Sequence, residues 1–83
     1  MEDEIELNEG HILEAIDRIH VAIMYLESSL SEHALLGSVT EFQNEIGKSI
    51  DILGNLYQTV GSLDSISDLS KNYDLRKGYK IRE

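Results

Sequence analysis

The sequence contains no cysteine, which excludes disulfide bonds and thiolate metal sites. It also contains no proline, so no residue forbids a long continuous helix. No apolar run approaches the roughly 20 residues that a membrane-spanning helix needs, and we therefore expect no membrane insertion. The chain has 83 residues. Because a domain of this size hides only about 60% of the surface of its unfolded form, we expect a partner or a second copy to supplement its core.

Basic residues are scarce in the first 70 positions. This part carries 14 acidic residues against only Arg18 and Lys48, whereas residues 71–83 carry five basic residues and two acidic ones. The acidic body should repel nucleic acid and anionic lipid, which argues against nucleic-acid binding. The start of the chain, from Met1 to Glu4, has the wrong charge for a signal peptide. The sequence therefore predicts a cytoplasmic protein, with any export following a leaderless route in complex with a partner.

Two segments carry apolar residues spaced alternately three and four positions apart, which is the pattern of an amphipathic helix. Asn8 suits the N-cap of the first helix, and Ser38 to Glu41 match a capping box before the second. The first row consists of Ile12, Ile16, Ile19, Ile23, Leu26 and Leu30, and the second of Val39, Phe42, Ile46, Leu53, Leu56, Val60 and Leu63, with Ser49 as its one polar member.

These patterns predict an all-α fold. Helices are expected over about residues 9–31 and 38–66, joined by a short turn into an antiparallel two-helix hairpin. The hairpin domain covers residues 1–70. Residues 71–83 carry no helical apolar period, and we expect them to form a basic flexible tail.

A row of small residues accompanies each apolar row. Each glycine inside a helix costs about 1 kcal/mol relative to alanine, so three cost on the order of 3 kcal/mol. Such a row indicates that another backbone comes close to the helix. That backbone can belong to the first helix of the hairpin, with the two small rows facing each other, to a second copy, or to a different protein. The small residues are Ala15, Ala22 and Ser29 in the first helix and Gly47, Gly54 and Gly61 in the second.

Two helices alone leave about half of such wide apolar faces exposed to water. We therefore expect a four-helix bundle, formed either by a homodimer or with a helical protein partner. The predicted interface consists of residues from the apolar and small rows of both helices: Ala15, Ile19, Ala22, Ile23, Leu26, Phe42, Ile46, Gly47, Ile50, Leu53, Gly54, Tyr57, Val60 and Gly61.

No constellation in the sequence indicates catalysis. His20 has Asp17 one turn before it and Glu27 after it, without the spacing of a zinc motif, and its expected place is the edge of the apolar face. His11 and His33 have no partner within reach by sequence. The acidic residues form no calcium loop, and two helices offer little concavity for an active site. We therefore expect no enzyme activity, no metal site and no cofactor.

The opening Glu4-Ile5-Glu6-Leu7-Asn8 leads into a helix, a central turn and a second helix. This layout resembles the small helical-hairpin proteins of the WXG superfamily, and within it the partners of LXG-type toxins in Gram-positive type VII secretion. The resemblance covers roughly residues 4–66. It implies a helix pair that packs against the helical N-terminal domain of a toxin and helps to target it for export.

The chain departs from that family in two motifs. It has no tryptophan for the W-x-G turn, where Leu36-Gly37 is the nearest equivalent. Only Tyr79 and Glu83 have the spacing of the C-terminal export signal, an aromatic residue four positions before an acid, and they lie outside the expected helices.

Three functions are compatible with these features. The first is a non-enzymatic adaptor or targeting partner that binds a helical protein, such as a toxin bound for secretion. The second is a small acidic inhibitor or antitoxin, such as a phage could encode, that blocks a cationic site on its target. The third is a structural homo-oligomer. For the tail, a recognition segment around Tyr73, Tyr79 and Ile81 and an unstructured end both remain open.

Overall fold

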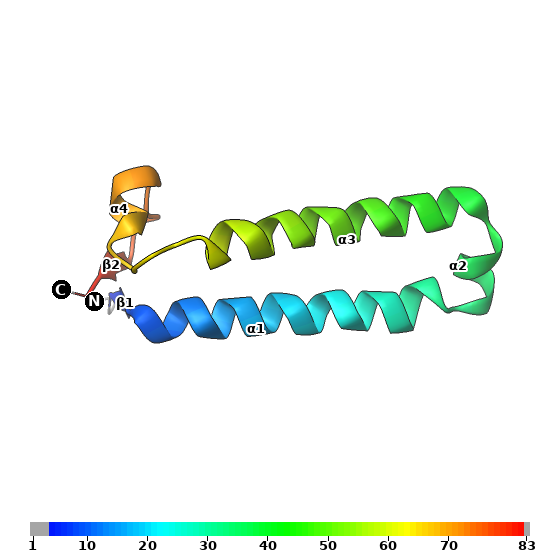
Figure 1. Cartoon of the computed structure of the whole chain (residues 1–83), viewed down its shortest axis with the longest axis horizontal. Helices are drawn as coiled ribbons and strands as arrows, with labels where there is room; N and C mark the ends of the chain where they lie inside the picture. Colours follow the sequence, from blue (N-terminus) through cyan, green and yellow to red (C-terminus); the bar gives the residue numbers. More distant parts are fainter. Residues whose placement is uncertain (1–3, 83) are drawn as a thin grey trace.

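Two long helices run side by side in opposite directions and make up most of the molecule (Figure 1). The computed structural model describes residues 4–82. Most of these residues are helical, which confirms the prediction of a mainly α-helical protein. In chain order the elements are β1 (Ile5–Leu7), α1 (Glu9–Leu26), a π-helical turn (Glu27–Ser31), α2 (Ala34–Ser38), α3 (Thr40–Gly61), α4 (Asp68–Asn72) and β2 (Tyr79–Ile81).

Asn8 caps α1, as the sequence predicts. Its Oδ1 accepts a hydrogen bond from the backbone N–H of Gly10 at 2.9 Å. His11 completes a capping box, because its Nδ1 accepts the backbone N–H of Asn8 at 3.0 Å. These bonds satisfy donors that otherwise have no partner at a helix N-terminus. The expectation that His11 has no partner is therefore wrong.

His33 provides the side-chain cap in the turn between the long helices. Its Nδ1 accepts the backbone N–H groups of Leu35 and Leu36 at 3.2 and 3.5 Å, and this starts α2. The capping box predicted at Ser38 is wrong, because Ser38 lies within α2 and its Oγ donates to the carbonyl of Leu35 at 2.7 Å. Val39 instead holds the N-cap position of α3, with no side-chain hydrogen bond.

The second long helix ends at Gly61, a few residues before the approximate bound at residue 66 and within the range from Val60 to Leu69 in which the sequence places its end. The Oγ of Ser62 donates to the carbonyl of Thr59 at 2.8 Å at this terminus. The chain then turns back toward the start of α1, where the backbone N–H of Ile66 donates to Glu9 Oε2 at 2.8 Å. Ile66 is 6% exposed and is the one buried residue among those that the structure describes. These contacts favour an early end to α3, because in a straight continuation Ile66, 20 residues after Ile46, would lie on nearly the opposite side of the helix and face away from α1.

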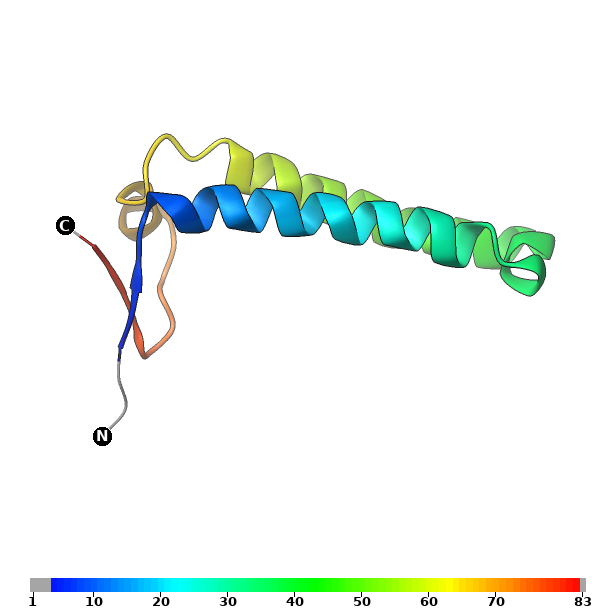
Figure 2. The same ribbon diagram turned by 90° about the horizontal axis from the view of Figure 1, so that it is seen from below.

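Part of the basic C-terminal segment pairs with the N-terminal arm, and the flexibility predicted for residues 71–83 stays a prediction. β1 and β2 form a parallel pair with Glu6 opposite Lys80, at the end of the molecule where both termini lie (Figure 2). Lys80 Nζ lies 3.6 Å from Glu4 Oε1, and Arg82 Nε lies 3.9 Å from Glu6 Oε1. Gly78 makes the turn into β2 with a φ of 98°, a conformation that other residues rarely adopt.

Candidate protein-binding face

The molecule is elongated and exposes much of its surface. Its principal extents are 50 × 30 × 19 Å and its radius of gyration is 16.6 Å, against about 12 Å for a compact domain of this length. The chain exposes 6562 Å², whereas a compact monomer of its mass exposes about 5,000 Å². The excess, roughly 1,500 Å², is larger than the area of about 800 Å² that one partner contributes to a standard interface.

Most of the predicted interface residues lie half-buried along α1 and α3. They pack the two helices together while remaining in part accessible to solvent, and their contact with a further protein stays a prediction. The half-buried residues are Ala15, Ile19, Ala22, Ile23, Leu26, Ile46, Gly47, Ile50, Leu53, Gly54, Tyr57 and Val60, while Phe42 and Gly61 are exposed.

Several large apolar side chains of the long helices are exposed and fall outside the predicted interface. Their signal in the sequence is a large apolar side chain outside the two apolar rows, with Leu56 as the exception because it belongs to the second row. These residues are Leu13, Val21, Met24, Tyr25, Ile52 and Leu56.

The two rows of small residues do not face each other. A Cβ atom added to Gly47, Gly54 or Gly61 meets nothing within 4 Å beyond the local helix backbone, so no part of α1 lies against these glycines. Ala15 instead lines a hollow together with Val60, so that a small residue of α1 meets a large residue of α3. Such alternation lets side chains interdigitate, and the close approach of the two small rows within one chain is excluded.

Two observations show which edges of the helices lie on the same side. The ring centroids of His20 and Tyr57 are 6.5 Å apart, and Tyr57 lies within one turn of both Gly54 and Gly61. At the opposite edge, Ala15 shares its hollow with Val60. The first contact places the edge of α3 that carries the glycine row on the same side of the pair as His20. The second contact places the other edge of α3 on the same side as Ala15.

This arrangement gives the helix pair two different sides. We call the first the open face, formed by Gly47, Gly54 and Gly61 of α3 with Leu13, His20 and Met24 of α1. We call the second the alanine face, formed by Ala15, Ala22 and Ser29 of α1 with Phe42, Ser49 and Leu56 of α3. On the open face, Leu13 and Met24 are 72% and 55% exposed, and the glycines offer space for another helix.

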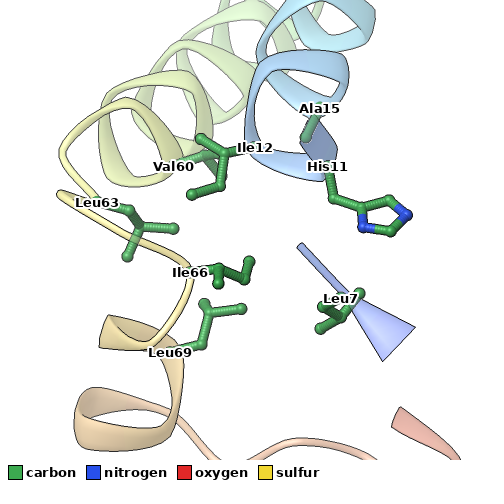
Figure 3. Close-up of a pocket in the computed structure, with 8 residues that line it drawn as sticks. All are labelled: Leu7, His11, Ile12, Ala15, Val60, Leu63, Ile66 and Leu69. Carbon is green, nitrogen blue, oxygen red and sulfur yellow. The ribbon is translucent and has the colours of Figure 1, made fainter. Parts of the chain in front are cut away.

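A hollow of about 190 Å³ lies at the end of the helix pair where α1 begins and α3 ends (Figure 3). Ile66 lies between the helix ends and Leu7 in this view, and His11 stands at the rim. The His11 Nδ1 already accepts a backbone hydrogen bond, so the hollow offers apolar packing and no evident acid–base pair. Its walls are formed by Leu7, His11, Ile12, Ala15, Val60, Leu63, Ile66 and Leu69.

Within residues 4–82, no group of three or more histidine and acidic side chains could hold a metal ion. No helix in this part of the chain is long and apolar enough to cross a bilayer. Comparisons with protein-family models, with curated proteins and with solved structures found no match to the chain.

Proposed function

We propose that this protein is a non-enzymatic interaction module, an adaptor that binds a helix of another protein on the open face. The observation that carries the proposal is the unfilled space beside Gly47, Gly54 and Gly61. Three glycines within one helix cost on the order of 3 kcal/mol relative to alanines. No contact within residues 4–82 uses the close approach that they permit, whereas a partner helix would.

The exposed surface supports the same proposal. An interface of standard size takes about 800 Å² from each partner, and the chain as a whole exposes more than this beyond what a compact fold exposes. Leu13 and Met24 flank the glycine row with side chains that water solvates poorly. A docked helix would cover them and complete a bundle, with either one further helix or a further helix pair.

We take the class of protein that this chain binds from its resemblance to the partners of LXG-type toxins. We propose a toxin with a helical N-terminal domain, bound before export and accompanied through a leaderless route. The resemblance rests on the opening from Glu4 to Asn8 and on the order of the helices.

The second candidate is an acidic inhibitor that blocks a cationic site. The excess of acids over residues 1–70 favours it, and so does the engagement of Arg18 and Lys48, the only two cations of this region, with Glu14 and Glu45 of their own helices. In this case charge would dominate binding and the glycine row would be incidental.

Salt separates the two functions. We expect a protein captured on the immobilised chain to stay bound when salt rises from about 0.05 to about 0.5 M, with affinity falling no more than roughly tenfold, because apolar packing is not screened. The affinity would be measured for each salt concentration by surface plasmon resonance. A fall of several orders of magnitude would support the inhibitor and contradict the adaptor.

A further inference from the structure

We propose that the helix covering the open face is a basic amphipathic helix of another protein, with lysine or arginine on either side of its apolar stripe, and not a second copy of this chain. This inference rests on the proposed function and adds the chemistry of the partner. The charges at the two edges of the open face carry it.

Acidic residues lie at both edges of the open face. Asp51 lies four residues after Gly47 and three before Gly54, so it borders the glycine row along α3. Glu27 begins the π-helical turn after α1. It follows Met24 by three residues and His20 by seven, so it lies at the edge of the open face that α1 forms. Both acids are exposed, and neither forms an ion pair within residues 4–82.

The cations of the helix pair do not neutralise these acids. Arg18 Nη2 lies 3.7 Å from Glu14, and Lys48 Nζ lies 3.3 Å from Glu45, each within its own helix. The open face therefore presents apolar side chains and backbone between two uncompensated carboxylates. A partner helix with basic flanks would place a cation near each of them.

A second copy fits this face poorly. Each chain carries a formal net charge of −9, and two open faces in contact would bring two copies each of Glu27 and Asp51 into one interface. Like charges brought together at an interface oppose association. Three of the five basic residues of the tail are also engaged elsewhere, because Lys71 pairs with Asp68, Lys80 with Glu4 and Arg82 with Glu6.

The test uses two synthetic helices of about 21 residues, long enough to follow α3. Both carry the same stripe of leucine and alanine, flanked by lysines in one and by glutamates in the other. Each is labelled with a fluorophore and titrated with the full chain at about 0.15 M salt, where charges more than about 8 Å away are largely screened. Fluorescence anisotropy gives the Kd.

We expect the lysine peptide to bind at least roughly tenfold more tightly than the glutamate peptide. Asp51→Lys should raise the Kd of the lysine peptide by roughly tenfold, because a cation at this position repels the lysines that the carboxylate attracts. Glu45→Lys is the matched control. It makes the same change in net charge on the same helix but lies toward the alanine face, beside Phe42 and Ser49, and should weaken binding less than about threefold.

Equal weakening by Asp51→Lys and Glu45→Lys would show general attraction between opposite charges and overturn the inference. Equal affinity for the two peptides, or no binding of the lysine peptide, would also overturn it. The proposed function is tested separately by Gly54→Leu. If both peptides bind equally and Gly54→Leu removes both, the charge inference fails while the helix-binding function stands. A homodimer disrupted by Gly54→Leu would identify the occupant as a second copy and overturn the inference.

Discussion

Gly54→Leu is expected to weaken the complex with the helical partner by roughly hundredfold, because a leucine side chain would occupy the space that the partner backbone needs. The same substitution should leave the isolated chain folded. A Cβ at this position meets nothing within 4 Å, and leucine favours a helix by about 0.8 kcal/mol relative to glycine. The variant should therefore unfold at a slightly higher urea concentration than the parent. Circular dichroism measures that change, and calorimetric titration measures the loss of binding.

Ser49→Leu is the matched control for this prediction. Ser49 lies in the middle of α3 like Gly54, but it is exposed where Gly54 is half-buried, and it belongs to the alanine face. If the partner covers the open face, Ser49→Leu should change the Kd by less than about threefold. Loss of binding with Ser49→Leu and full binding with Gly54→Leu would move the interface to the alanine face.

Ile66→Ala is expected to lower the free energy of unfolding by about 2–3 kcal/mol. Ile66 is the one buried residue within residues 4–82, and its side chain lines the hollow between the helix ends and the N-terminal arm. A chain of this size has a total stability of only about 4–12 kcal/mol, so the loss is large. Urea unfolding followed by circular dichroism measures it.

Leu13→Ala provides the control for Ile66→Ala. Leu13 is 72% exposed, and its truncation should change the free energy of unfolding by no more than about 0.5 kcal/mol. If the two variants unfolded at the same urea concentration, the return of the chain over the end of the helix pair would contribute nothing to stability. The account of why α3 ends at Gly61 would then be wrong.

Local patterns were enough to predict the helical character of the chain. The alternating three- and four-residue spacing of apolar residues identified the two long helices, and Asn8 marked the start of the first. The caps formed by His11 and His33 were missed, because histidine is not among the usual N-cap residues and its role depends on which ring nitrogen faces the backbone. The cap predicted at Ser38 failed because α2 extends through that position.

Contacts between distant segments could not be predicted in this way. The pairing of β1 with β2 joins the two ends of the chain, and the hydrogen bond from Ile66 to Glu9 joins residues 57 positions apart. Neither leaves a periodic signal in the sequence. The small-residue rows predicted that a backbone comes close, but only the structure shows that α1 is not that backbone. The predicted interface includes the glycines and leaves out the exposed Leu13 and Met24, and contact of any of these residues with a partner stays a prediction.

The central claim is that a helix of another protein packs directly on Gly47 and Gly54. The most direct measurement is the set of intermolecular nuclear Overhauser effects between the isotope-labelled chain and the unlabelled lysine peptide. We predict cross-peaks from the Hα atoms of Gly47 and Gly54 to peptide side chains, with Met24 as a further contact. Cross-peaks confined to Phe42 and Leu56, with both glycines unaffected, would contradict the claim.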